Sequence, residues 1–365
     1  MNLTVTATED PFDDLYGHFD RRETLLKILT TPPNPAPRMN LADYTAMNTA
    51  DRQLFDHQRQ EHIIDGVVVE TPPLAELRRL LHRALLTARK PVGRGGLILT
   101  GPATMGKTTA SLKAMKDALR HHEARFPNWQ ELGHTPVVYI EVPPGSTGKA
   151  IMGRILEFFG LPVRSKMTLE ERTQLVVHHL NHGRTSLLVI DEMQNLAKLT
   201  LGHFESAQAI KDLTNGIRAV PLLVGINLDQ SVITNGILGE QFAARSKTVK
   251  LGRLGYATDD DRRLWKGAIH AFEQELVLLN HKPGTLFPHA ELIWNLTRGS
   301  IGALANLLTT AALDLIDAGN PEDETITPDV LANVKLDLTT EREHDRIAEA
   351  EAKAGRKKSE KHRAA

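Results

Sequence analysis

Short apolar runs alternate with amphipathic segments through the middle of the chain. Each apolar run is four to six residues long and is bounded by glycine, proline or polar residues, as is typical of buried strands. The predicted strands are 96–100, 137–142, 185–190, 221–226 and 248–251, and the predicted helices between them are 109–119, 149–159, 169–181 and 207–217. This alternation predicts an α/β fold, with a parallel sheet that carries helices on both faces.

The flanks of this region have a helical pattern. After about residue 259 we predict only helices, at 259–279, 288–297, 301–318 and from Thr327, whose side chain caps a helix that begins with Pro328. Ahead of the first strand the predicted helices are 16–29, 47–65 and 74–90. The segment 30–38 is rich in proline, so it is expected to be an extended linker that no helix continues through.

Composition excludes several classes of protein. Lys and Arg number 44 against 45 Asp and Glu, so any nucleic-acid surface must be local. The absence of cysteine excludes disulfides and thiolate metal sites. No apolar run approaches the length of a membrane span, and the first residues are acidic rather than signal-like. We therefore expect a soluble cytoplasmic protein with no membrane partner.

The segment GPATMGKTT, residues 101–109, carries the strongest chemical signal. It fits the pattern G-x-x-x-x-G-K-[ST] between a predicted strand and a predicted helix, which is the context in which this pattern binds phosphate. Glycines let backbone N–H groups converge on phosphate oxygens, and the positive end of the following helix points at them. The expected ATP-binding residues are Gly101, Pro102, Ala103, Thr104, Met105, Gly106, Lys107, Thr108 and Thr109. We expect Lys107 to reach the β- and γ-phosphates and Thr108 to hold Mg²⁺.

Two carboxylates, Asp191 and Glu192, directly follow the predicted strand 185–190. Ligands of a parallel sheet bind outside the carboxyl ends of its strands, so this pair is expected beside the phosphate loop. Asp191 would hold Mg²⁺ through its water shell, and Glu192 would orient and deprotonate the attacking water. A solvated acidic pair is the alternative, but a bound nucleotide needs a metal ligand at this place. The sequence therefore predicts an ATPase.

Two polar residues are weaker candidates for the same site. Asn227 follows the strand 221–226, where it is either a sensor of the γ-phosphate and water or a simple turn former. Arg245 precedes the strand 248–251, from where it would reach the nucleotide of a neighbouring subunit and stabilise transition-state charge; the alternative is a surface salt bridge. Arg253 is a further, weaker arginine candidate. His178 and His182 lack a third ligand, so they are interpreted as a polar helix face.

The motifs together resemble a known family. The strand 137–142 falls between the two motifs, and Glu follows Asp, which resembles the additional-strand, catalytic-Glu class of P-loop ATPases. GPATMGKT, LLVIDE, PLLVGIN, an arginine before the fifth strand and a helical lid resemble an AAA+ ATPase. Within AAA+, the segment DRQLFDHQRQEHIIDGVVVETPPL, the strand VVYIEVPP before a helix ending FFGLP, and LTRGSIGALANLL are similar to the TniB/TnsC family of transposon ATPases, over about 45–337.

This resemblance implies a domain organisation and a mechanism. The expected domains are an N-terminal extension with a proline-rich linker at 1–44, an AAA+ nucleotide-binding domain with leading helices at 45–255, a helical lid at 256–338 and a charged, disordered tail at 339–365. Family members bind ATP and Mg²⁺ and assemble as homo-oligomeric rings or filaments on double-stranded DNA. They recruit or activate a transposase, with a target-selector protein as a further partner, and hydrolysis disassembles the oligomer.

The resemblance also leaves questions open. Many AAA+ lids carry a sensor arginine three residues after the lid glycine, but Gly302 occupies that position here, and whether Arg298 replaces the arginine stays open. DNA-backbone contacts are expected from Lys149, Arg154 and Lys166, with ordinary solvated side chains as the alternative. A STAND-like signalling switch, a helicase loader or a defence ATPase would use the same nucleotide site. A STAND switch would need a sensor domain, for which the residues after 337 leave no room.

Overall fold

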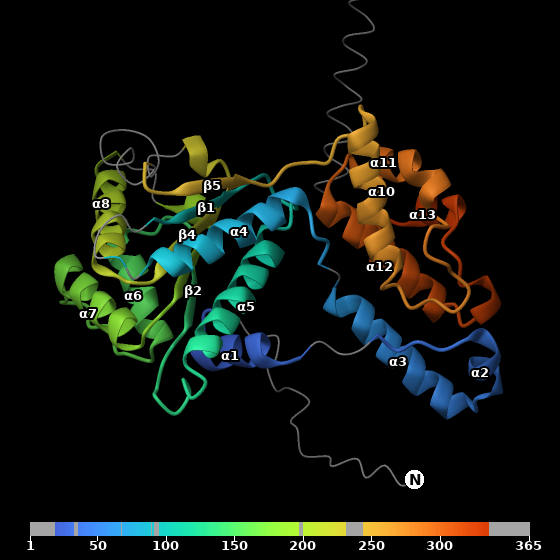
Figure 1. Cartoon of the computed structure of the whole chain (residues 1–365), viewed down its shortest axis with the longest axis horizontal. Coiled ribbons are helices and arrows are strands. Elements are labelled where there is room, and N and C mark those ends of the chain that lie inside the picture. Colours follow the sequence, from blue (N-terminus) through green and yellow to red (C-terminus); the bar gives the residue numbers. More distant parts are fainter. Residues whose placement is uncertain are drawn as a thin grey trace, which may run out of the picture. The chain divides into compact units, whose positions relative to one another are not determined.

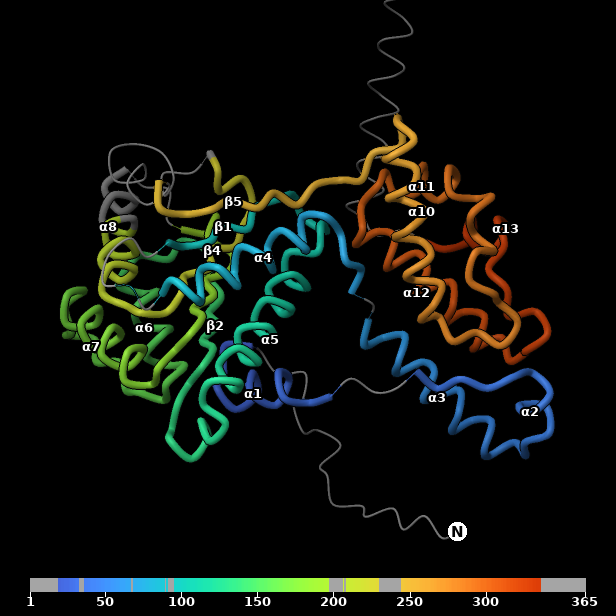
Figure 2. The backbone as a smooth tube through the Cα atoms, viewed as in Figure 1, coloured from blue at the N-terminus to red at the C-terminus, as the bar shows by residue number. Residues whose placement is uncertain are grey.

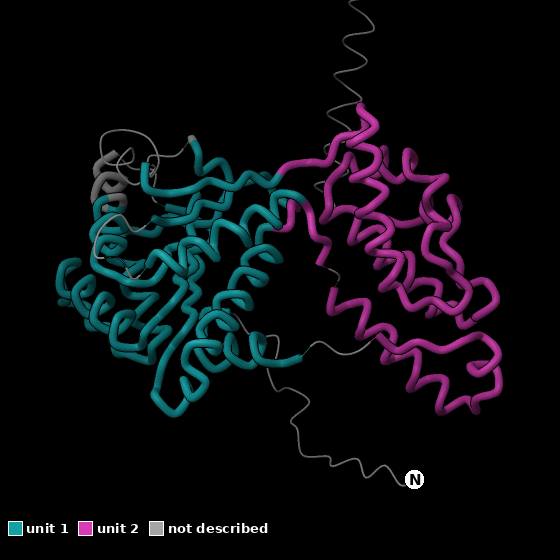
Figure 3. Tube along the Cα trace, viewed as in Figure 1, with its two compact units in different colours: residues 1–32, 72–103, 107–251 teal, residues 33–71, 104–106, 252–365 magenta. Residues whose placement is uncertain are grey.

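A computed structural model describes residues 19–32, 36–66, 68–88, 90, 95–196, 200–230 and 244–335. The charged tail and the first part of the N-terminal extension lie outside these described residues. The chain divides into two compact units (Figure 3). Unit 1 is 1–32, 72–103 and 107–251, and unit 2 is 33–71, 104–106 and 252–365.

Unit 1 is built on a parallel sheet that has five strands among the described residues (Figure 1). The strands are β1 (Leu97–Thr100), β2 (Val137–Glu141), β3 (Leu187–Asp191), β4 (Val220–Gly225) and β5 (Lys247–Lys250), in the spatial order β2-β3-β4-β1-β5. The side chains of β1, β3 and β4 are buried throughout, as expected for strands inside a parallel sheet. All five carboxyl ends therefore meet at one edge of the sheet.

The strand order corrects one detail of the sequence interpretation. We expected the strand 137–142 to be the one inserted between the two motif strands. The structure instead places β2 at the outer edge, and β4 lies between β1 and β3. This order confirms a parallel sheet of the additional-strand type, and the residues after β5 form the helices that were also expected.

The helices of unit 1 form two packed groups (Figure 2). Their bounds are α1 (Arg22–Thr30), α4 (Pro72–Thr87), α5 (Lys107–Arg125), α6 (Gly148–Phe158), α7 (Leu169–His182) and α8 (Thr200–Gly216). Helix α4 packs on α5 through leucines at helical spacing, and both contact the sheet. Helices α6, α7 and α8 pack on one another, and α6 contacts β2. Helix α5 runs to Arg125, well past the predicted end at 119, because its last turns bury Leu119 and His122.

Unit 2 is helical. Its helices are α2 (Leu41–Ala46), α3 (Thr49–Asp65), α10 (Asp259–Glu273), α11 (Ala290–Thr297), α12 (Ile301–Asp317) and α13 (Pro328–Asn333). Short 3₁₀ turns occur in the chain at Met193–Asn195, Leu228–Gln230, Phe287–His289 and Pro321–Asp323. Trp265, Phe272 and Leu304 lie at the centre of a buried apolar core.

Among the described residues no single helix is long and apolar enough to cross a membrane. One bent pair of helices, Phe287–Thr297 and Ile301–Asp317, reaches that length and apolar character only when the two helices are taken together.

Helices α2 and α3 belong with this helical core, whereas the sequence placed residues 45–71 with the nucleotide-binding domain. Ile63 of α3 joins the apolar core of unit 2. Arg59 of α3 is fully buried and donates two hydrogen bonds to Glu324, at 2.6 and 3.0 Å. A buried guanidinium needs such a carboxylate, so this pair fixes α3 in unit 2.

Candidate active site

The phosphate-binding loop connects the end of β1 to the start of α5, as the sequence predicts. Gly101 passes so close to Leu251 that a Cβ at position 101 would lie 2.5 Å from the Leu251 carbonyl oxygen. Gly106 has φ +77°, a left-handed conformation that side chains other than glycine disfavour. Glycine is therefore required at both fixed positions by the backbone. Thr108 and Thr109 are exposed in the first turn of α5.

Lys107 folds back over this loop. Its side chain is buried, and its Nζ donates to the carbonyl oxygens of Gly101 and Pro102, at 3.1 and 2.7 Å. Burial lowers the pKa of Lys107, while the carboxylates of Glu192 and Asp191 act in the opposite direction. These carboxylates are thus close enough to interact electrostatically with the lysine.

Asp191 closes β3 and is held through both of its carboxylate oxygens. The hydroxyl of Tyr139, on β2, donates to Oδ2 at 3.1 Å, and the backbone N–H of Glu192 donates to Oδ1 at 2.7 Å. Both Tyr139 and Asp191 are buried. Burial first, and then the charge of Asp191, raises the pKa of Tyr139, so the phenol stays protonated and remains a donor.

Glu192 stands in a left-handed backbone conformation with φ +57°. Such a conformation is uncommon for a residue other than glycine and is often found at functional sites. Its Oε2 accepts a hydrogen bond from Nε2 of Gln194. The Oε1 of Gln194 in turn accepts from the backbone N–H of Ile226, at 2.9 Å. Gln194 therefore links the carboxylate after β3 to the end of β4.

The end of β4 is also tied to β1. The N–H of Leu228 donates to the hydroxyl of Thr100 at 3.0 Å, which holds the turn that contains Asn227 beside the last residue of β1. Asn227 is exposed and has φ +51°. The structure thus brings Lys107, Asp191, Glu192 and Asn227 to the carboxyl edge of neighbouring strands, while their roles remain predictions.

Tyr139 and Gln194 were not recognised from the sequence. Tyr139 lies far from Asp191 in the chain, and only the register between β2 and β3 makes them neighbours. Gln194 follows Glu192 by two residues, but its use as a bridge depends on β4. The available signals were a tyrosine inside the apolar strand β2 and a polar residue in the turn just after the acidic pair.

Other predicted residues lie elsewhere. Arg245 is exposed two residues before β5, level with Gly95 at the amino edge of the sheet. Because the phosphate loop starts at Gly101, six residues along β1 separate them, roughly 20 Å at the rise of a strand. Arg245 therefore cannot serve the nucleotide of its own subunit.

The three candidate DNA contacts lie after β2. Lys149 Nζ donates to the Ser165 carbonyl at 3.4 Å, which places it beside the loop that carries exposed Lys166. Arg154 is exposed and pairs with Glu157 at 3.6 Å on α6. No cluster of His, Asp or Glu suited to a metal ion occurs in the described part of the chain.

The lid position that lacks the sensor arginine has another role in unit 2. The N–H of Gly302 and the hydroxyl of Ser300 both donate to the carbonyl of Thr104, each at 3.2 Å. Arg298 ends α11 with φ +51°, and its carbonyl accepts from Nη1 of Arg253 at 3.0 Å. Its Nε is buried, with no hydrogen-bond partner among the described residues.

A glycine loop with a buried lysine, followed two strands away by an Asp–Glu pair, defines the class: this protein is an AAA+ ATPase. Residues 83–255 match the family model described as "Bacterial TniB protein". This match agrees with the family that the sequence motifs led us to expect.

Comparison with solved structures gives distant similarities. The Aeropyrum pernix Orc1 protein in complex with DNA is 19% identical, with 77% of this chain and 68% of that chain covered and a TM-score of 0.49. Cdc6p from Pyrobaculum aerophilum is 17% identical, with 74% and 72% covered and a TM-score of 0.47. Domain III of the Thermotoga maritima replication initiation protein DnaA is 13% identical, with 82% and 96% covered and a TM-score of 0.43. No curated protein matches the sequence.

Proposed function

We propose that this protein is an ATP-dependent, DNA-binding regulator of transposition. It oligomerises on duplex target DNA when ATP is bound, recruits or activates a transposase, and disassembles when ATP is hydrolysed. The proposal is supported chiefly by one observation: Glu192 follows a buried, doubly hydrogen-bonded Asp191 and shares an electrostatic neighbourhood with Lys107. An ATPase site of this kind limits the lifetime of the oligomer, because hydrolysis consumes the nucleotide that holds the assembly together.

Each residue of the site has a proposed role. Lys107 exchanges the loop carbonyls that it contacts for the β- and γ-phosphate oxygens of ATP. Glu192 orients the attacking water and accepts its proton, and Asn227 contacts the same water or the γ-phosphate. Gln194 fixes the direction of the Glu192 carboxylate.

The residues fit a magnesium ion. Thr108 offers a hydroxyl and Asp191 a carboxylate, and oxygen ligands are those that Mg²⁺ prefers. When bound, Mg²⁺ would neutralise phosphate charge. Tyr139 orients Asp191 for this task through its hydrogen bond to Oδ2.

Oligomerisation is supported by the position of Arg245. It is exposed at the sheet edge opposite its own phosphate loop, so a nucleotide in a neighbouring subunit is the one that it would reach. An arginine that stabilises the transition state in trans links hydrolysis to assembly. We infer that DNA contacts from Lys149, Arg154 and Lys166 go to the phosphate backbone, because these side chains carry charge but no base-reading arrangement.

The test is a gel shift with duplex DNA in ATP, in ADP and in a non-hydrolysable ATP analogue. We expect tight, length-dependent binding with the analogue and weak binding with ADP. The Lys107→Ala variant is the control, because its nucleotide site is impaired while its DNA-facing residues are intact. Equal DNA binding in all three nucleotide states would remove the basis for the transposition role.

A further inference from the structure

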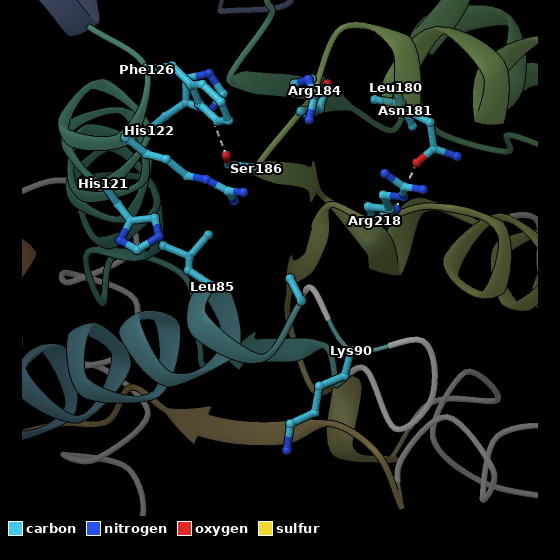
Figure 4. A pocket seen from close by; sticks show the side chains of 13 residues that line it. Leu85, Lys90, His121, His122, Phe126, Leu180, Asn181, Arg184, Ser186 and Arg218 are labelled. Atoms are coloured by element: carbon cyan, nitrogen blue, oxygen red, sulfur yellow. Dashed lines mark hydrogen bonds between the residues drawn. The ribbon is translucent and has the colours of Figure 1, made fainter.

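A cavity of about 530 Å³ lies in unit 1 at the amino edge of the sheet (Figure 4). It is lined by the last turns of helices and by residues that lead into strands: Arg125 ends α5, Arg184 precedes β3, and Arg218 precedes β4. Because all strands are parallel, this edge is opposite to the one that carries Lys107 and Asp191. The cavity is therefore separate from the ATP site.

The lining is strongly basic. Four of its side chains are cationic, Lys90, Arg125, Arg184 and Arg218, and in the described lining there is no Asp or Glu. Arg125 and Arg184 both lie over the ring of Phe126, with guanidinium carbons 4.8 and 5.7 Å from its centroid. One aromatic ring thus holds two like charges near each other.

Helix dipoles offset only part of this charge. Helices α4, α5, α7 and α8 all end at this edge, and each carbonyl end contributes roughly half a negative charge. Set against the four cations of the lining, those ends together contribute about two negative charges. Neutralising helix ends therefore does not by itself explain the cluster.

Hydrogen bonds hold several polar residues of the lining in place. Buried His122 is hydrogen-bonded to Ser186 Oγ at 2.9 Å through Nδ1, and to His134 Nδ1 at 3.1 Å through Nε2. Its pKa is lowered to about 4, first by burial and then by His134 and Arg125, so the imidazole is neutral at pH 7. The Asn181 side chain accepts the N–H of Arg218 at 2.9 Å and thereby fixes the loop that carries this arginine.

We propose that this cavity is a second anion site, which binds a phosphate group through Arg184, Arg218 and Arg125. A phosphate dianion is complementary in charge to this cationic lining, and planar guanidinium groups bind phosphate oxygens in pairs. The volume suits a small phosphate-bearing molecule or the terminal phosphate of a nucleic-acid strand.

The experiment is calorimetric titration of the full chain in the Lys107→Ala background, which weakens phosphate binding at the ATP site. The probes are inorganic pyrophosphate and a 12-nucleotide strand with or without a 5′-phosphate. We expect saturable pyrophosphate binding that falls at least tenfold when Arg184→Ala and Arg218→Ala are combined, since two charge-assisted contacts are lost. The Arg120→Ala variant, at an exposed arginine of α5 outside the cavity, should bind like the parent.

The two sources of phosphate give different results. A strand that binds only with its 5′-phosphate, and with the same arginine dependence, identifies a nucleic-acid end, whereas pyrophosphate binding alone identifies a small ligand. Pyrophosphate binding that is absent, or unchanged in the double variant, would overturn the proposal, as would strand binding that ignores the 5′-phosphate and both arginines. With Lys107 intact, the double variant should hydrolyse ATP at the normal rate, because the altered residues lie at the opposite edge.

Discussion

Replacing Tyr139 with Phe tests whether a residue on the edge strand controls the ATPase centre. The change keeps the buried ring and removes one hydroxyl, so the apolar packing of β2 is retained. The lost bond, 3.1 Å to Oδ2 of Asp191, joins a neutral donor to a buried carboxylate. Hydrogen bonds to charged groups contribute about 1.5–3 kcal/mol, which corresponds to roughly 10- to 150-fold in a rate or binding constant.

We expect the Tyr139→Phe variant to bind ATP nearly as tightly as the unaltered protein, since Lys107 and the glycine loop are unchanged. Its kcat should fall about 10-fold or more, and a higher Mg²⁺ concentration should be needed for half-maximal rate, because Asp191 is no longer oriented. The assay is steady-state phosphate release over a Mg²⁺ titration, with ATP affinity measured separately.

The chain offers a matched control. Tyr44 donates to Asp56 Oδ2 at 2.7 Å in unit 2, and its pKa is raised to about 12, first by burial and then by the bond to Asp56. Tyr44→Phe removes the same kind of hydrogen bond far from the ATPase residues in the chain. It should lower stability but leave kcat and the Mg²⁺ dependence unchanged. A Tyr139→Phe variant with the normal rate and normal Mg²⁺ dependence would refute the positioning role.

Two further predictions concern stability. The folded-state pKa of His122, about 4, lies below the ordinary value of 6.5, so the unfolded chain takes up a proton that the native chain does not. Stability should therefore fall by up to about 3 kcal/mol as the pH drops from 6.5 to 4, and urea titrations of His122→Gln should show a weaker pH dependence. Glu324→Gln should destabilise unit 2 by about 3 kcal/mol by leaving Arg59 buried with less charge compensation, whereas Asp259→Asn, which breaks an exposed pair, should cost less than about 1 kcal/mol in thermal unfolding. Equal losses in the last two variants would show that the Arg59 pair is not buried in solution.

The sequence predicted the strands and most helices because each is a local pattern. The loop 101–108 and the pair Asp191–Glu192 were recognisable for the same reason, since their chemistry is carried by adjacent residues. The order of the strands was less accessible. Both β2 and β4 are apolar runs. Their residues do not indicate which of the two strands forms hydrogen bonds with β1.

Contacts between residues far apart in the chain could not be predicted from the sequence. Arg59 and Glu324 are separated by 265 positions, so nothing in α3 indicated that it packs with the lid helices. In the sequence, Tyr139 is an ordinary tyrosine within a strand. Only the pairing of β2 with β3 shows that its hydroxyl donates a hydrogen bond to Asp191. The basic cavity was missed because its cations come from separate segments of the chain, none of which is unusually basic by itself.

The most direct test of the account is a single-turnover measurement of ATP cleavage by the Glu192→Gln variant, with nucleotide binding measured on the same sample. The amide keeps the shape of the side chain but cannot accept the proton of water. The account predicts ATP binding as in the unaltered protein, with cleavage slowed by about 10²- to 10⁴-fold. Cleavage by Glu192→Gln at the normal rate, or failure of the unaltered protein to bind ATP, would contradict it.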